Sequence, residues 1–267
     1  MFSPLLHGML IGIANLIPGV SGGTLAVILG IYERLIQSIN AVLKSPFKTK
    51  SEWLFLIQIA CGAILGIGGF AKVLNYTLTV YPQPTYWFFI GLIIGSIPVI
   101  KALHPSMKIT PINVSLFSAI IVAMFLLTIS PELAPNNNVV YLFISGIIAA
   151  STMIVPGLSG SLILLIMGSY QPILNAVSEG HLTIIAIVGC GAILGIVCTS
   201  KLIKWCLDER PTETYVIIIG LLCGSIIKLY PGFPFNGHTL INILCISLGL
   251  GLALKLSGTQ SKQSPKR

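Results

Sequence analysis

Residues 12–24 read Gly-Ile-Ala-Asn-Leu-Ile-Pro-Gly-Val-Ser-Gly-Gly-Thr, and this stretch decides how the chain must fold. It separates two apolar runs, residues 5–17 and 24–42. As a helix the first run would extend only ~20 Å, less than the ~30 Å hydrocarbon core of a bilayer. Joined as one helix, the two runs would extend ~57 Å, which is far too long. The sequence therefore predicts a helical hairpin that enters the membrane and returns, with the Pro-Gly break at its tip.

The composition of the whole chain agrees with a membrane location. Of the 267 residues, 55% are hydrophobic and 27 are Gly, whereas only 8% are charged. Soluble domains carry about 25% charged residues, so a soluble globular domain, a disordered chain and a disulfide scaffold are all excluded. The six cysteines show no paired spacing, and we expect them to be small buried hydrophobic residues.

Further apolar runs follow the first two at residues 54–74, 86–100, 112–130, 139–155, 161–177, 182–205, 215–229 and 240–256. In lipid the backbone must satisfy its own hydrogen bonds, and runs of this length do so as helices. The predicted fold class is therefore an all-α polytopic membrane protein. Non-helical backbone inside the membrane is tolerated only where it is buried in protein or lines a cavity, so the break marks a cavity.

The chain contains an internal repeat. Pro18, Gly19, Ser21, Gly22, Gly30 and Tyr32 recur 138 positions later as Pro156, Gly157, Ser159, Gly160, Gly168 and Tyr170, and residues 61–67 are identical to residues 190–196. We expect a first repeat over residues 1–134, with a re-entrant hairpin at 5–42 followed by three transmembrane helices. We expect a second repeat over 135–257, with its hairpin at 139–177 and three more helices, and a polar basic cytoplasmic tail at 258–267.

The second repeat is predicted to be inverted relative to the first. Each copy has about five apolar segments, and the number of membrane crossings is odd whether or not the hairpin spans the membrane. With both termini on one side, that side receives every basic residue except Lys72 and Lys228. The positive-inside rule then makes both termini cytoplasmic. Inverted repeats with broken helices are typical of alternating-access transporters, whose substrate site lies near the midplane where the breaks meet.

The two breaks carry residues suited to an anion. A helix that begins at a Gly-rich break presents unpaired N–H groups, and Gly lets a ligand approach the backbone closely. Ser21 and Thr24, or Ser159 and Ser161 in the second copy, could donate hydroxyl hydrogen bonds to a phosphate or carboxylate. The alternative is structural: Pro-Gly breaks the helix and the serine caps the next one.

Glu33 and Arg34 lie in an otherwise uncharged run of the first copy only. Arg34 is suited to phosphate, and Glu33 is either its partner or a proton carrier, so proton coupling is an expectation. The alternative is an ion pair at the membrane interface, where Arg reaches toward water. Tyr32 and Tyr170 are expected to pack or to anchor the hairpins, and Lys72 and Lys201 to anchor helix ends or to meet lipid phosphates.

The sequence offers few residues suited to metal binding, catalysis or nucleic-acid binding. The four His are dispersed and nothing resembles a set of metal ligands or paired catalytic carboxylates, so we expect no catalytic residue, no metal and no cofactor. The basic residues lie in short connections between apolar runs, which argues against nucleic acid as a partner. The expected partners are lipids.

The motifs at residues 12–24, 30–34, 156–161 and 168–170 resemble those of the polyprenyl-phosphate transporters, the undecaprenyl-phosphate translocases of bacterial plasma membranes. The resemblance covers essentially the whole chain. It implies re-entrant hairpins and a carrier-recycling activity in which undecaprenyl phosphate, the C55 lipid carrier, returns from the outer to the inner leaflet for envelope polymer synthesis. The matching residues that it implies for substrate binding are Pro18, Gly19, Ser21, Gly22, Gly23, Thr24, Tyr32, Glu33, Arg34, Pro156, Gly157, Ser159, Gly160, Ser161 and Tyr170.

Two other functions remain open on the sequence alone. Undecaprenyl-diphosphate phosphatases share inverted repeats and Pro-x-Ser tips, but they also require a cluster of Glu with an Arg beside the serine. Here Ser21 and Ser159 are followed by Gly-Gly and Gly-Ser instead. A transporter of a small soluble anion could use the same helix breaks without any path for a lipid.

The topology can be tested by labelling. Single cysteines placed near Lys48 and in the C-terminal tail should react with an impermeant reagent from the same, cytoplasmic, face of the membrane. Labelling of these two positions from opposite faces would contradict the inverted repeat.

Overall fold

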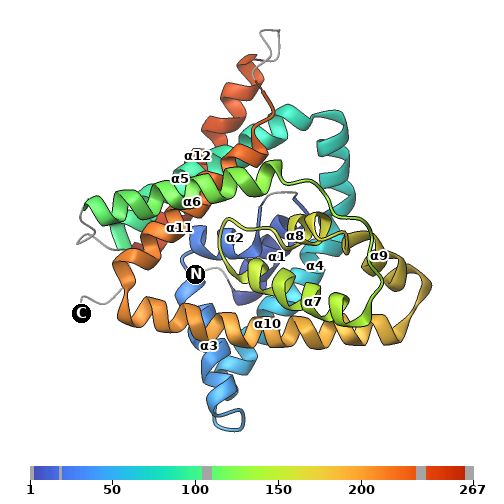
Figure 1. The fold of residues 1–267 in the computed structure, drawn as a ribbon. Coiled ribbons are helices and arrows are strands. Elements are labelled where there is room, and N and C mark those ends of the chain that lie inside the picture. Colours follow the sequence, from blue (N-terminus) through green and yellow to red (C-terminus); the bar gives the residue numbers. More distant parts are fainter. Residues whose placement is uncertain (1–2, 18–19, 104–109, 233–238, 262–267) are drawn as a thin grey trace.

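The computed structural model describes residues 3–17, 20–103, 110–232 and 239–261 (Figure 1). Within these residues the chain is helical, with short connections and no strand, which confirms the predicted all-α class. The helices are α1 (Pro4–Asn15), α2 (Gly22–Ile28), α3 (Tyr32–Lys44), α4 (Lys50–Val80), α5 (Pro82–Leu103), α6 (Pro111–Ile129), α7 (Val139–Ile154), α8 (Gly160–Ile166), α9 (Tyr170–Glu179), α10 (Leu182–Glu209), α11 (Pro211–Leu229) and α12 (Thr239–Ser261).

Several of these helices can cross a membrane. Among the described residues, α4, α6, α10 and α11 are each long and apolar enough to do so. Two bent pairs, α2 with α3 and α8 with α9, pass the same test only when each pair is taken together. Helices α1 and α7 are shorter apolar helices that lead into the two breaks. A polytopic membrane protein is therefore confirmed.

One expectation was wrong in detail, because residues 24–42 and 161–177 do not each form one helix. The chain turns by 117° between α2 and α3 and by 109° between α8 and α9. At both turns a glycine, Gly30 or Gly168, has φ of 65°. The next residue donates its N–H to a carbonyl five positions back, from Ile31 to Ala26 and from Ser169 to Leu164, both at 2.9 Å. This is a Schellman ending, and the left-handed glycine forces the helix to stop.

Glycines let the helices pack closely, and the same contacts occur in both halves of the chain. Helix α4 packs on α1 and α10 packs on α7. A Cβ at Gly62 would overlap the carbonyl oxygen of Leu5, and one at its repeat counterpart Gly191 would overlap that of Phe143. The internal repeat is thus visible in the packing, while the inverted orientation of the second copy stays a prediction.

The remaining long helices pair across the two halves. Helix α5 packs on α12, and α11 packs on α6, so each half supplies one member of each pair. This exchange joins the two halves into one body, and α5, α6, α11 and α12 lie together in the upper left part of Figure 1.

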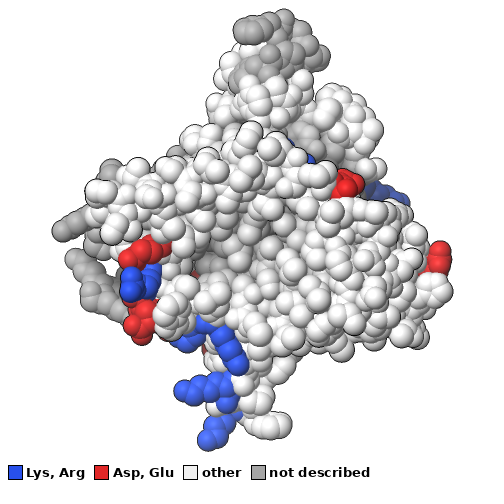
Figure 2. Space-filling model, viewed as in Figure 1, with Lys and Arg blue, Asp and Glu red and all other residues white. Residues whose placement is uncertain are grey.

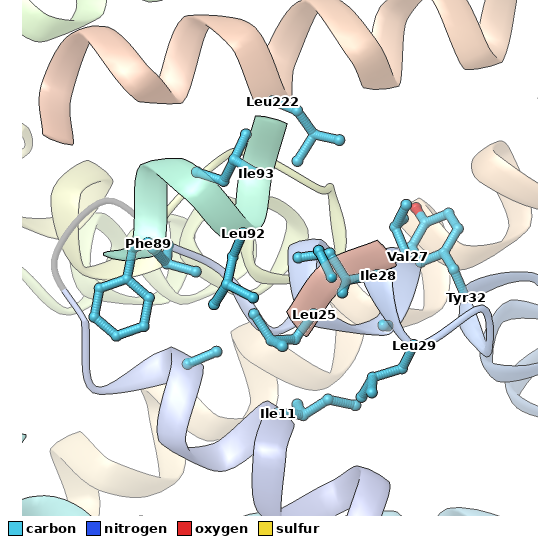
Figure 3. Close-up of a cluster of buried hydrophobic side chains, with 14 of the residues drawn as sticks. Ile11, Leu25, Val27, Ile28, Leu29, Tyr32, Phe89, Leu92, Ile93 and Leu222 are labelled. Carbon is cyan, nitrogen blue, oxygen red and sulfur yellow. The ribbon is translucent and has the colours of Figure 1, made fainter. Parts of the chain in front are cut away.

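Helix α2 lies in the middle of the protein. All seven of its residues are buried. In Figure 3 its side chains lie near Ile11 of α1 and Leu92 and Ile93 of α5, and Leu222 of α11 completes this part of the core. The counterpart α8 differs, because only Gly160 and Ile163 are buried there. The first hairpin is therefore part of the core and the second lies nearer the surface.

The cysteines do not behave as expected. Cys61, Cys190 and Cys198 are exposed, and the other three are only partly buried. The physical reason is that lipid solvates the apolar outer surface of a membrane protein, so apolar neighbours in sequence do not imply burial. At the end of the chain, α12 continues through residues 258–261 of the expected tail, and residues 262–267 lie outside the described residues.

The close packing of α1 on α4 predicts unequal effects of two similar substitutions. Gly66→Ala should lower the melting temperature of the purified protein, because its Cβ would overlap the Met9 carbonyl and overpacking costs about 1–3 kcal/mol. Gly68→Ala, two residues along the same helix, meets open space and should leave stability unchanged or raise it by up to about 1 kcal/mol. Equal melting temperatures for the two variants would contradict this packing.

Candidate functional site

The two helix breaks are in direct contact. The Ser21 hydroxyl donates to the Val155 carbonyl at 3.3 Å, and the Gly157 N–H donates to Thr24 Oγ1 at 2.9 Å. A Cβ on Gly23 would lie 2.5 Å from the Ile154 carbonyl oxygen. Residues more than 130 positions apart in the chain thus form one site. Pro18 and Gly19, which were also expected here, lie outside the described residues.

At the first break, protein groups occupy most of the backbone donors. The Gly22 N–H donates to Asn15 Oδ1 at 2.8 Å, and the Thr24 N–H donates to Ser21 Oγ at 3.2 Å. Ser21, Gly22, Gly23 and Thr24 are all buried. The break is therefore capped from within the protein, in keeping with the structural alternative for this copy.

The second break differs because the backbone N–H groups at the start of its helix have no hydrogen-bond acceptor among the described residues. Ser159 precedes α8 but makes no capping hydrogen bond; its hydroxyl lies 2.9 Å from that of Ser161. Among the described residues, the N–H groups of Gly160, Ser161 and Leu162 donate to no backbone carbonyl, and no side chain caps this helix. This copy presents backbone donors that the described residues do not use.

The repeat explains the difference between the two breaks. The residue that corresponds to Asn15 is Met153, and the residue that corresponds to Thr24 is Leu162. Asn15 caps the first break, whereas Met153 has no oxygen to offer and instead packs against Gly160, where a Cβ would lie 2.6 Å from Met153 Cγ. The contrast can be found in the sequence by aligning the two copies, although the motif residues alone do not show it.

A narrow crevice opens beside the second break. Its lining comes from three elements: Gly157, Leu158, Ser159 and Leu162 at the break, Met124, Leu127 and Thr128 on α6, and Ser225 and Lys228 on α11. Its volume of about 10 Å³ admits roughly one water molecule. Lys228 has no carboxylate partner among the described residues. Sequence reasoning identified this lysine only as an exception to the charge bias, not as a site residue.

The charged pair of the first copy is arranged differently from expectation. Glu33 accepts a hydrogen bond from the Tyr215 hydroxyl on α11, and the Arg34 guanidinium lies 4.2 Å from the centre of the Phe55 ring. No ion pair joins Glu33 to Arg34 in the described part of the chain. Of the two roles expected for Glu33, partner of Arg34 or proton carrier, the first is not seen, because Tyr215 and Phe55 on other helices contact these two side chains instead.

The two tyrosines also differ from each other. Tyr32 is only 4% exposed and belongs to the core around α2, which favours the packing role expected for it. Tyr170 is 36% exposed. Neither side chain lines the crevice. Pro156 and Gly157 are buried at the second break, where Gly157 has φ of +86° and a Cβ would press on Leu221 of α11.

Comparison with known proteins gives three matches that agree. The family model described as undecaprenyl phosphate translocase-like matches residues 11–242. A polyprenyl-phosphate transporter of Vibrio cholerae serotype O1 is 33% identical over 240 residues, covering 86% of this chain and 77% of that protein. A polyprenyl-phosphate transporter of Staphylococcus aureus is 34% identical over 248 residues, covering 87% of each. No solved structure matches the chain significantly.

The contact between the breaks predicts a stability effect at Thr24. Thr24→Val keeps the shape of the side chain but leaves the buried Gly157 N–H without an acceptor, which costs about 1–3 kcal/mol. The matched control is Thr152→Val, which removes only a hydrogen bond to Ala149 within its own helix. Thermal unfolding in detergent should show a clearly larger loss for Thr24→Val, and equal losses would mean that the contact between the breaks is unimportant.

Proposed function

This chain belongs to the undecaprenyl phosphate translocase-like family, and we propose on that premise that it transports polyprenyl phosphate across the membrane in which its helices lie. The specific substrate is undecaprenyl phosphate, the C55 carrier, which returns from the outer to the inner leaflet of the bacterial plasma membrane. The observation that carries the proposal is the second helix break, which has no side-chain cap and whose Ser159 lines one crevice with Lys228.

The chemistry of this break suits a phosphate on an isoprenoid tail. A phosphate monoester carries a charge of about −1.5 to −2 at pH 7 and has strong acceptor oxygens. Ser159 and Lys228 line the crevice, and the uncapped first turn of α8 follows Ser159 directly. We infer that the Ser159 hydroxyl and the N–H groups of that turn donate to these oxygens, while Lys228 supplies the opposite charge. Apolar residues of the same lining, Met124, Leu127 and Leu162, suit the first isoprene units. The rest of the tail can stay in lipid.

Binding requires a change of shape. A crevice of about 10 Å³ is too small for a phosphate group, so α6 and α11 must move away from the second break to admit it. The first break is buried and capped, and it provides the fixed side of the site. Lys228 falls on the side predicted to be outside, which suits capture of the lipid from the outer leaflet.

Transport is favoured over the two other functions considered. The curated relatives are named transporters, and both names specify a polyprenyl phosphate rather than a small soluble anion. The phosphatase alternative needs carboxylates beside the serine, and none is among the residues that line the crevice at Ser159. We infer that the serines bind the phosphate rather than attack it.

The proposal predicts different roles for two lysines on the side predicted to be outside. Lys228→Gln should lower transport about tenfold or more, because a hydrogen bond to a charged group contributes about 1.5–3 kcal/mol. Lys72→Gln removes the same charge on α4, away from the crevice, and should transport normally. The assay is reconstitution into liposomes with labelled undecaprenyl phosphate, in which a membrane-impermeant probe reports leaflet exposure. Unaltered transport by Lys228→Gln would refute this site.

We propose in addition that transport is coupled to protons through Glu33. Its hydrogen bond to Tyr215 fixes the first part of α11 to α3, and the same helix carries Ser225 and Lys228 to the crevice. Protonation of Glu33 removes the negative charge that strengthens this bond and so frees α11 to move.

Glu33→Gln should then flatten the dependence of transport on pH in the liposome assay. Tyr215→Phe removes the hydrogen bond but keeps the carboxylate, and it should flatten the profile in the same way if the bond to α11 is the coupling element. A wild-type pH profile in both variants would exclude coupling through this pair.

A further inference from the structure

A second basic feature lies on the surface, away from the helix breaks. It is a groove of about 520 Å³ between the last turns of α3 and the second half of α10. Its polar lining consists of Gln37, Asn40, Lys44, Lys201 and Lys204, and Leu43 contributes an apolar side. Figure 2 shows basic side chains gathered over these two helices, at the lower left of the view. The groove shares no lining residue with the crevice at the second break.

The charge of this groove is largely unbalanced. Lys204 pairs with Asp208 at 2.6 Å, but Lys44 and Lys201 have no carboxylate partner in the described part of the chain. Like charges that face one groove repel each other, and an anion held between them removes this cost. The groove is therefore suited to a negatively charged ligand.

The groove has a fixed shape because its two walls are joined. The Asn40 side-chain N–H group donates to the Ser200 carbonyl of α10 at 2.9 Å and to the Ile36 carbonyl of its own helix at 2.8 Å. Ser200 immediately precedes Lys201, so this link sets the position of the lysine relative to Lys44 across the groove. The two unpaired lysines come from different halves of the chain, and their meeting follows from the packing of α3 on α10.

The surroundings of the groove are those of a membrane interface. Leu202 and Trp205, beside the lysines on α10, are 58% and 57% exposed, and Leu43 is also exposed. Exposed Trp and Leu next to lysines are typical of the level where lipid headgroups meet acyl chains. A soluble anion needs no such apolar border, whereas a phospholipid has both a phosphate and acyl chains to place.

We propose that this groove binds the phosphate headgroup of an anionic lipid in the leaflet that faces the basic side of the protein. The headgroup phosphate lies between Lys44 and Lys201, with amide donors from Gln37 beside it, and the acyl chains extend along Leu43 and the apolar face of α10. This site is separate from the transport site, and its occupant holds α3 and α10 together rather than crossing the membrane.

The test measures lipid retention, not transport. Purified full-length protein is mixed with phosphatidylglycerol or with phosphatidylcholine, and bound lipid is counted by native mass spectrometry. The double variant Lys44→Gln/Lys201→Gln should lose about 25-fold in affinity for phosphatidylglycerol, from about fivefold for each lysine near an anionic surface. The loop control, Lys48→Gln/Lys50→Gln, removes the same charge from the loop after α3 and the first residue of α4, outside the groove, and should retain wild-type affinity.

Two further measurements establish that the lysines of the groove bind a lipid headgroup. Lys44→Arg/Lys201→Arg keeps the charge and should restore retention, which separates a binding defect from misfolding. Inorganic phosphate at millimolar concentration should not displace the lipid; displacement would assign the groove to soluble phosphate and overturn the lipid proposal. Equal loss in the groove variant and the loop control would reduce the effect to general surface charge and would also overturn it. Because no step measures transport, these outcomes do not depend on the function proposed for the helix breaks.

Discussion

The structure depends on how the backbone is satisfied where two helices break inside an apolar protein. A broken helix leaves donors and acceptors unpaired, and in lipid each such group costs several kcal/mol. Here the two breaks solve part of the problem for each other, because the Thr24 hydroxyl accepts from the Gly157 N–H and the Ser21 hydroxyl donates to the Val155 carbonyl. Glycine at position 23 permits this contact, and the core around α2 follows from it.

The two copies of the break share a motif but have taken different roles. Asn15 and Ser21 accept hydrogen bonds from N–H groups of the first break, whereas Met153, the counterpart of Asn15, offers no oxygen, and Ser159, the counterpart of Ser21, does not cap α8. Burial differs in the same direction, since α2 is wholly inside the protein and α8 is not. The repeated motif predicted a symmetric pair of anion sites, but the two breaks differ in capping and in burial, and the proposed phosphate site uses the uncapped second break.

The sequence predicted the features that follow from local chemistry and from the repeat: the helical fold, the interruption between α1 and α2 and between α7 and α8, and the approach of these two segments to each other. Features that depend on neighbours distant in sequence were not predictable in the same way. The partners of Glu33 and Arg34 are Tyr215 and Phe55, which lie on other helices. The prediction that the cysteines are buried was wrong, because residues of an apolar run in a membrane protein can face either the protein interior or the lipid. Gly30 and Gly168 are repeated in the sequence, but each glycine lies within an apolar run. The sequence therefore predicted one continuous helix there rather than a helix that ends in a Schellman motif.

The electrical cost of the proposed transport bears on the role of Glu33. A phosphate that moves from the outer to the inner leaflet carries negative charge toward the negative side of the membrane, against about 2.3 kcal/mol per charge for every 100 mV. Each proton that moves with the lipid cancels one unit of this charge. A carboxylate that joins α3 to α11, the helix that also carries Lys228, is well placed for such a role, because its protonation and the opening of the crevice act on the same helix. Coupling through one helix requires no chain of charged residues through the membrane, and it is compatible with a chain that has only 7 acidic residues in total.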